Sequence, residues 1–310
     1  MALEGDMRVW PIPIFAVILL TFAAAAEAAT TIPLETQGPR DLITIKVGNV
    51  VIPDILLDSG FAYDGVIIYN TQYLDSLDLS DAVQVKIPGA GSGQPSEGVM
   101  IDSTCFTVGD RELANQKIIL LRGDAFKGFP SNGVTGYSIF GHYITEIDRD
   151  LGVINLYPPE DAPIDSTWTT LPLYFKNNKI PWVDVSVVIR DEAPTTLSTY
   201  IDFAASDVIV LLDRPGMKIS LPDDTVAAYI GRGLSGDVYG KAGTISKLVI
   251  GPYELTKVKA SIAAEKVRER QPGADAVLGC GAFTGFNLIF DYAHSKLHLK
   301  PNSHFGELGN

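Results

Sequence analysis

The chain has 310 residues, of which 46% are hydrophobic, and it contains 29 glycines and 19 prolines. This is enough apolar material for one large or two medium globular domains. The formal net charge of −13 argues against a nucleic-acid partner, because no basic tract offers counterion release.

The first 28 residues have the layout of a secretory signal peptide. Arg8 forms a short basic region, an apolar stretch covers residues 9–26, and Ala26-Glu27-Ala28 supplies small residues at a cleavage site. The alternative is an uncleaved membrane anchor, for which this apolar stretch is barely long enough. We expect the protein to be exported, either periplasmic or secreted, with cleavage near Ala28.

The remainder of the chain has the pattern of short β-strands separated by glycine, proline and asparagine. Short helices are expected at 69–78 and 223–231. The proline-containing stretch at 157–172 is the expected boundary between an N-terminal lobe (29–160) and a C-terminal lobe (161–310). The segments richest in β-branched residues are 41–47, 50–57, 100–108, 182–189, 207–212, 245–250 and 295–300.

Landmarks in the first half of the chain recur in the second half at an offset of 142 to 144 residues. ILLDSGFAYDGVIIY, which contains Asp58, matches TYIDFAASDVIVLL, which contains Asp202. GSGQPSEG matches GLSGDVYG, and FTVGDREL matches LVIGPYEL. NGVTGYSIFGHYITEIDRDLGVINLY matches DAVLGCGAFTGFNLIFDYAHSKLHLK. Matches in the same order along both halves predict an internal duplication that forms two similar β lobes.

Each half places one acid at the end of an apolar strand, Asp58 in the first and Asp202 in the second. Equivalent loops of two pseudo-symmetric lobes can meet at the axis between them, so the two carboxylates are expected to face each other. Two carboxylates in contact cannot both ionise cheaply, and one keeps a proton. The ionised acid can then draw a proton from water while the other donates to a substrate carbonyl oxygen. The alternative is that both acids are solvated turn residues.

These residues resemble the motifs of the aspartic peptidases, especially bacterial retropepsin-like proteins with two lobes in one chain. LLDSG resembles the family's hydrophobic-Asp-Thr/Ser-Gly loop, and YIDFAAS resembles it loosely. GVTG (133–136) and AVLG (276–279) resemble the hydrophobic-hydrophobic-Gly segment that packs beneath each acid. The resemblance covers residues 40–300. It implies an all-β, bilobal pepsin-like fold with two pseudo-symmetric β-barrel lobes and a cleft between them, and an Asp58/Asp202 catalytic pair that needs no cofactor or metal.

The resemblance also assigns supporting roles to Ser59, Gly60 and Ser206. Family members use a hydroxyl after the acid to link the two loops, which Ser59 can do and Phe203 cannot. The glycine two positions after the acid lets the backbone approach the carboxylate closely. The second lobe has Ala204 there, which would cost about 1 kcal/mol if the position needs a positive φ.

The family's glycine-rich flap hairpins would fall at 89–98 and 231–240. GRGLSG, within the second of these segments, also fits a dinucleotide-binding fingerprint, but the pattern of a turn and a strand follows it where that motif requires a helix. A hairpin tip is therefore the favoured interpretation. The flap residues expected near a substrate are Gly91, Gly93, Tyr239 and Gly240.

The remaining reactive side chains are given structural or solvent-facing interpretations. Two cysteines make no disulfide framework in a chain of this length, so they are expected to be free, buried thiols. The two histidines near the last strand are expected on the surface, and the acids that follow the two loops are expected to face solvent. These residues are Cys105, Cys280, His294, His298, Asp64 and Asp207.

Three functions follow from these patterns. The first is an exported, monomeric aspartic endopeptidase that holds an extended peptide in the interlobe cleft through main-chain hydrogen bonds. The second is a non-catalytic protein whose cleft binds a peptide or a component of the cell envelope. The third is a purely structural module. A membrane contact is expected only if the N-terminal segment stays uncleaved.

Overall fold

The computed structural model describes residues 28–307 apart from 124, 161–162, 177–178, 191, 218 and 265–271. The predicted signal peptide therefore lies outside the described residues, except for Ala28. Strands dominate the described part of the chain and the helices are short, which confirms the all-β class. No helix in this part is long and apolar enough to cross a membrane.

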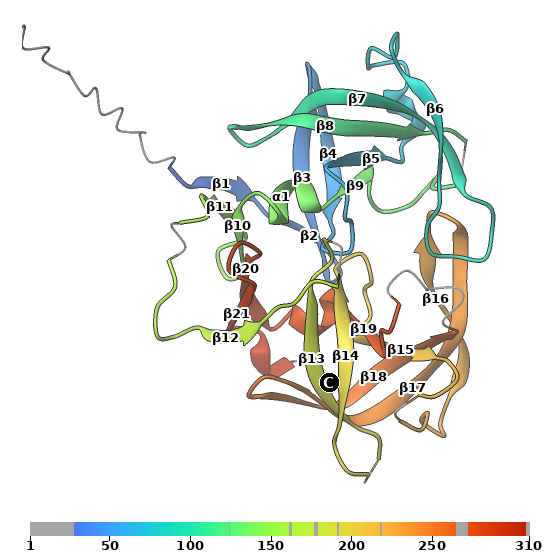
Figure 1. Ribbon diagram of the computed structural model, residues 1–310, viewed down its shortest axis with the longest axis vertical. Coiled ribbons are helices and arrows are strands. Elements are labelled where there is room, and N and C mark those ends of the chain that lie inside the picture. The colour runs from blue at the N-terminus through green and yellow to red at the C-terminus, as the bar shows by residue number, and fades with distance from the viewer. Residues whose placement is uncertain are drawn as a thin grey trace, which may run out of the picture.

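The first half of the chain forms an eight-stranded sheet, which occupies the upper part of Figure 1. The spatial order is β2-β3-β4-β9-β5-β8-β7-β6, and an additional pairing of β3 with β7 brings the sheet back onto itself. The strands are β2 (Glu35–Gln37), β3 (Arg40–Val47), β4 (Val50–Leu57), β5 (Gly65–Ile68), β6 (Val83–Ile87), β7 (Ser96–Val108), β8 (Arg111–Leu121) and β9 (Gly133–Thr135).

The second half forms a seven-stranded sheet with the matching order β13-β14-β19-β15-β18-β17-β16, in the lower part of Figure 1. The pairing of β13 with β17 corresponds to that of β3 with β7. Two lobes with the same strand order confirm the two-lobed arrangement that the repeat predicts. The strands are β13 (Trp182–Val188), β14 (Thr195–Asp202), β15 (Ile209–Asp213), β16 (Val226–Gly233), β17 (Gly236–Ile250), β18 (Tyr253–Ala264) and β19 (Ala276–Gly279).

A six-stranded sheet joins the two lobes and lies on the left in Figure 1. Its order, β1-β11-β10-β20-β21-β12, is symmetric about the antiparallel pair β10–β20. The segment predicted as the lobe boundary connects β11 to β12. The strands are β1 (Thr30–Pro33), β10 (Ile144–Asp148), β11 (Val153–Tyr157), β12 (Thr169–Pro172), β20 (Phe286–Asp291) and β21 (Lys296–Pro301).

The helices differ from those expected. The segment 69–78 contains only η1 (Thr71–Tyr73), and the helix expected at 223–231 is wrong because β16 occupies most of it. β16 pairs with β17 along its length, and this pairing overrides the helical preference of its two alanines. The other short helices are α1 (Tyr137–Phe140), η2 (Cys280–Phe283) and η3 (Phe305–Glu307).

The main core runs through both lobes and the joining sheet. Alternate residues of β3 and β13, such as Ile43, Ile45, Val183 and Val185, are almost fully buried in it. Fully buried phenylalanines of β20 extend it beneath the second lobe. This shared core fixes the two lobes against each other and thereby positions the loops described next.

Candidate active site

Each acid lies at the end of a strand in the middle of its sheet. Asp58 directly follows β4, and Asp202 ends β14. β9 lies between β4 and β5, parallel to the first and antiparallel to the second. β19 has the same relation to β14 and β15. The two acids therefore occupy equivalent places in the two lobes.

A glycine lies beneath each acid loop, and there is no room for a side chain at either position. A Cβ atom at Gly136 would overlap the main-chain oxygen of Asp58. A Cβ atom at Gly279 would overlap the main-chain oxygen of Asp207 and would lie 2.6 Å from that of Ala205. The GVTG and AVLG segments are therefore both constrained by close backbone crossings.

The two carboxylates meet at one main-chain N–H group. Ala204 N donates to Oδ1 of Asp58 and to Oδ1 of Asp202, at 3.1 Å in each case. The two oxygens are therefore no farther apart than twice that distance. Gly60 N donates to the same oxygen of Asp58 at 2.7 Å, and Ala205 N donates to that of Asp202 at 3.2 Å. Main-chain donors thus hold one oxygen of each acid in place.

The hydroxyl of Ser59 links the two acid loops. Ser59 Oγ donates to the main-chain oxygen of Ile201 at 3.0 Å, and Ser59 is 2% exposed. Its counterpart Phe203 is fully buried and packs against Phe283 and Phe290, with ring centroids 5.6 and 5.3 Å away. The second loop is therefore held by aromatic packing where the first is held by a hydrogen bond.

The backbone strain considered for Ala204 does not arise. Neither Gly60 nor Ala204 is among the described residues with a positive φ. Glycine is needed at position 60 for a different reason: a Cβ atom there would lie 3.0 Å from Asp202 Cγ and 3.0 Å from Asp58 Oδ1. The equivalent methyl group of Ala204 packs against apolar side chains of the first lobe.

Ser206 is half-buried, and its main-chain oxygen lies against Gly281. A Cβ atom at that glycine would be 2.7 Å from this oxygen. The main chain of Ser206 thus supports the packing beneath the second loop. The supporting role expected of its hydroxyl stays a prediction.

The acids that follow the two loops do not simply face solvent, as was expected. Lys179 Nζ donates to Asp64 at 2.6 Å, and His142 Nε2 lies 2.8 Å from its other oxygen. Partial burial raises the pKa of Asp64, but these two partners outweigh it and hold the pKa below its ordinary value. Asp207 is half-buried and accepts a hydrogen bond from the Ser261 hydroxyl.

Hairpins from the two lobes touch each other. The turn between β16 and β17 inserts into the loop between β6 and β7, and we call this contact the flap clasp. Four hydrogen bonds form it: Ser235 N to Ala90 O (2.9 Å), Gly93 N to Ser235 O (2.6 Å), Gly89 N to Ser235 Oγ (2.9 Å) and Ser96 Oγ to Leu234 O (2.6 Å).

The four predicted flap residues fall into two groups. Gly91 and Gly93 lie in the flap clasp, and Gly91 has a φ of 116° that favours glycine. Tyr239 and Gly240 lie in β17; Tyr239 is 65% exposed and packs against Tyr229. GRGLSG forms the end of β16 and the following turn, so no helix follows it and the dinucleotide fingerprint does not apply.

Each lobe contains a smaller apolar cluster that is completed by residues of the other lobe. The first apolar cluster, in lobe one, is joined by Ala204 and Leu234 from the second lobe. The second apolar cluster, in lobe two, is joined by Ala62 and Ala90 from the first. The first consists of Leu42, Leu56, Phe61, Ile67, Tyr69, Ile87, Leu121, Phe126 and Val134, and the second of Ile180, Trp182, Tyr200, Val210, Leu212, Ile230, Val238, Ala263, Ala274 and Val277.

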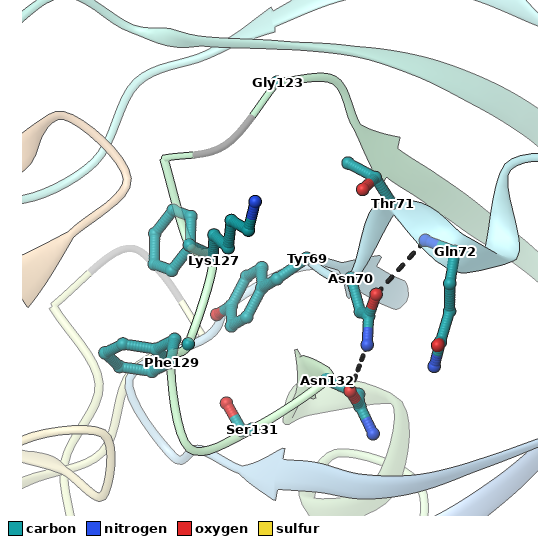
Figure 2. A pocket seen from close by; sticks show the side chains of 11 residues that line it. Tyr69, Asn70, Thr71, Gln72, Gly123, Lys127, Phe129, Ser131 and Asn132 are labelled. Atoms are coloured by element: carbon teal, nitrogen blue, oxygen red, sulfur yellow. Dashed lines mark hydrogen bonds between the residues drawn. The ribbon is translucent and has the colours of Figure 1, made fainter.

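A pocket of about 400 Å³ adjoins the first apolar cluster, and Figure 2 shows its lining. Tyr69 and Phe126 belong to both. Burial, together with the negative charges of Asp58 and Asp202, raises the pKa of Tyr69 well above its ordinary value. Tyr69 could not be identified from the sequence, because the repeat pairs it with no residue of recognisable chemistry.

The histidines near the last strand are not both on the surface. His298 is 2% exposed and hydrogen-bonded through Nδ1 to Thr170 Oγ1 at 2.9 Å, and burial lowers its pKa. His294 lies in the preceding turn, with Nδ1 2.9 Å from the carboxylate of Asp291.

Both cysteines are free thiols, but only Cys280 is buried, and Cys105 is half-buried. Burial raises the pKa of the Cys280 thiol, which makes it a poor nucleophile. Within the described ranges, no three histidine, cysteine or acidic side chains are grouped so that they could hold a metal ion. The paired carboxylates are thus the centre on which a functional argument can be built.

Comparison with known proteins does not assign the chain to a family. No protein-family model matches it, and no curated protein matches it. The geometry around Asp58 and Asp202 must therefore carry the functional argument.

Proposed function

We propose that the protein is an aspartic endopeptidase with a pepsin-like bilobal fold, which hydrolyses peptide bonds with a water molecule activated between Asp58 and Asp202. The observation that carries this proposal is the N–H group of Ala204, which donates to one oxygen of each acid. Two acids from different lobes would have no reason to converge on one donor if they were solvated turn residues.

Two adjacent carboxylates of this kind act as a pair that shares one proton. The ionised acid takes a proton from the water molecule while the water oxygen attacks the peptide carbonyl carbon. The protonated acid donates its proton to the carbonyl oxygen. The tetrahedral intermediate then collapses. Its C–N bond breaks, the acid that took a proton from water passes it to the departing nitrogen, and the other acid takes its proton back as the carbonyl group re-forms. No atom beyond those of water and the two acids is required.

The surroundings of the acids support an extended peptide as the substrate. Each lobe carries an apolar cluster that includes a residue close in sequence to its acid, Phe61 in the first and Tyr200 in the second. The glycines at positions 89, 91 and 93 and the turn of the opposite hairpin expose main-chain groups that can pair with a peptide once the flap clasp opens. The predicted export of the protein is consistent with a peptidase that acts outside the cytoplasm.

A non-catalytic binding protein is the second candidate, and the observation in its favour is Phe203. In the aspartic peptidases, a residue with a hydroxyl group follows the acid and would link the second loop to the first. Here the ring of Phe203 takes that position and is buried in the core. With one loop less firmly braced, the cleft would hold a peptide or an envelope component without positioning water for attack.

The deciding experiment is cleavage of an unbiased peptide library by the purified protein from about pH 3 to about pH 8, the range in which carboxylate pairs titrate. Asp58→Asn and Asp202→Asn are tested beside it, since each keeps the shape of the acid and removes its charge. We expect cleavage to fall at least about 100-fold in both variants. Full activity in either variant would refute the proposal. A folded wild-type protein that cleaves nothing would favour the binding candidate.

A further inference from the structure

The first acid loop ends on an ion pair whose cation comes from the other lobe. This loop connects β4 to β5 and runs from Asp58 to Asp64. Lys179 of lobe two donates to the carboxylate of Asp64 at 2.6 Å, and its Nζ atom lies 3.7 Å from the centre of the Tyr137 ring. The main-chain N–H group of Tyr137 donates to the oxygen of Phe61, in the middle of the loop, at 2.9 Å. Lys179 therefore contacts both the end of the loop and a residue that holds its middle.

The two residues that follow Lys179 lie against the second acid and against the first loop. The main-chain oxygen of Pro181 accepts a hydrogen bond at 2.9 Å from Ile201, the residue before Asp202. Ile180 is 2% exposed and belongs to the second apolar cluster, which Ala62 of the first acid loop joins. We call residues 179–181 the interlobe strut. One short segment thus connects the two acid loops, so its position bears on the distance between the two carboxylates.

The interlobe strut is fixed at its base in lobe two. Tyr174 and Trp182 exchange main-chain hydrogen bonds of 3.0 and 2.9 Å, which close the loop that contains the strut. The ion pair at its tip is partly open to solvent, since the side chain of Lys179 is 41% exposed and that of Asp64 is 34% exposed. Ion pairs exposed to this degree add little to the stability of the whole protein. A variant of Lys179 should therefore fold, which makes its effect on the acids measurable.

The interlobe strut has no equivalent in the first lobe. Residues 35–37, which lie one repeat before Lys179, include no basic residue. Asp207, the counterpart of Asp64, accepts its hydrogen bond from Ser261 of its own lobe. Phe203 has no hydroxyl with which to tie the second loop to the first. The strut is thus a second connection between the acid loops, made from lobe two, beside the hydrogen bond of Ser59.

We infer that Lys179 is a positioning residue, which sets the spacing of Asp58 and Asp202 by tying the end of the first acid loop to the main chain beside the second acid. This inference rests on the proposed function for its effect on cleavage. It goes further by naming a residue outside both acid loops that controls how the acids meet.

The kinetic test compares Lys179→Met, which keeps the apolar stem and removes the charge, with Lys179→Arg, which restores a cation that can bond a carboxylate and stack on a ring. We expect Lys179→Met to lower kcat about tenfold with KM close to that of the wild type, because misplaced acids affect the chemical step. Lys179→Arg should recover most of this loss. Equal kcat values for Lys179→Met and the wild type, or a loss that Lys179→Arg does not recover, would overturn the inference.

His142→Ala is the matched control for these variants. His142 is the other partner of the Asp64 carboxylate, at 2.8 Å, but it belongs to lobe one and makes no connection between the lobes. We expect its kcat to match that of the wild type. Asp64→Asn should reproduce the loss seen in Lys179→Met, and the double variant should lose no more than either single variant. Equal losses in His142→Ala and Lys179→Met, or additive losses in the double variant, would contradict a positioning role for Lys179.

A spectroscopic measurement separates this inference from the proposed function. The N–H group of Ala204 donates to both acids, so its amide proton reports on their spacing without any catalysis. In NMR spectra of Lys179→Met we expect this proton to shift upfield and to exchange faster with solvent, because its hydrogen bonds lengthen. Both changes should be absent in His142→Ala and reversed in Lys179→Arg. This result would support the inference even if no peptide is cleaved. A wild-type Ala204 signal in Lys179→Met would overturn the inference, and cleavage that depends on Asp58 and Asp202 would still establish the proposed function.

Discussion

Gly60→Ala would place a methyl group against both carboxylates of the proposed active site. The new Cβ atom would lie 3.0 Å from Asp202 Cγ and 3.0 Å from Asp58 Oδ1. Both contacts are tighter than a Cβ atom ordinarily makes, so the acids must move by a few tenths of an ångström. The φ of Gly60 is not positive, so the backbone itself tolerates alanine and the effect is purely steric.

The expected consequences follow from that displacement. Overpacking at a well-packed site lowers the free energy of unfolding by about 1–3 kcal/mol. A misplacement of about 1 Å in a catalytic group can cost about 100-fold, so this smaller shift should lower kcat/KM by up to about tenfold. Urea unfolding measures the first quantity, and cleavage of a peptide selected from the library measures the second.

Ala204→Gly is the matched control, because it alters the equivalent position of the other loop in the opposite direction. It keeps the N–H group that donates to both acids and removes only a methyl group. We expect it to cost about 0.5–1 kcal/mol of stability through added chain entropy and to leave kcat/KM close to that of the wild type. Wild-type cleavage and unfolding in Gly60→Ala, or equal losses in both variants, would refute the reasoning.

Three further predictions concern the loops and their supports. Ser59→Ala leaves a buried main-chain carbonyl without its cross-lobe donor, so urea unfolding should show a loss of about 1–3 kcal/mol, and an unchanged midpoint would contradict this. Gly136→Ala forces a methyl group into the main-chain oxygen of Asp58 and should prevent soluble expression or lower the midpoint of thermal unfolding severely. A wild-type midpoint would show that the main chain does not pass this close to position 136. The lowered pKa of Asp64 means that its pairing with Lys179 and His142 stabilises the protein above about pH 4 and that this contribution is lost as the pH falls through the folded-state pKa. Asp64→Asn should remove this part of the pH dependence of the free energy of unfolding. The effect should be less than about 1 kcal/mol, because a third of the side chain is exposed. Identical profiles of unfolding free energy against pH for the variant and the wild type would contradict this prediction.

The duplication could be predicted from sequence because its landmarks are positions where few residue types fit. Gly136 in the first half and Gly279 in the second are equivalent, and both are glycine because a Cβ atom at either position would overlap a main-chain oxygen. Asp58 and Asp202 recur at the ends of equivalent strands. Constraints of this kind act through the backbone at the position itself and therefore restrict which residue types the sequence can have there.

Features that depend on a distant partner could not be predicted in the same way. Residues 226–233 form a strand because β17 pairs with them. His298 was expected on the surface, but Leu297, His298 and Leu299 are all buried, because both faces of β21 are covered. The packing of both faces depends on β12 and the core, which no periodicity within β21 reveals.

The pocket of Figure 2 was missed for a related reason. Tyr69 directly follows β5, Ser131 precedes β9, and neither lies in a motif. The pocket that these residues line and the raised pKa of Tyr69 are properties of the folded chain. The proposed reacting groups could therefore be identified from the sequence, but the pocket could not.

The symmetry of the six-stranded sheet has a consequence for a half-length chain. β10 and β20 are equivalent strands that pair antiparallel at the centre of this sheet, with β11 and β21 on their outer sides. A fragment ending after β11 would carry an unpaired edge on β10, and such an edge is a template for another strand. Two copies of the fragment could pair their β10 strands about a twofold axis and rebuild the central four strands. The half-length chain would then be a homodimer, with one Asp58 from each copy facing the axis.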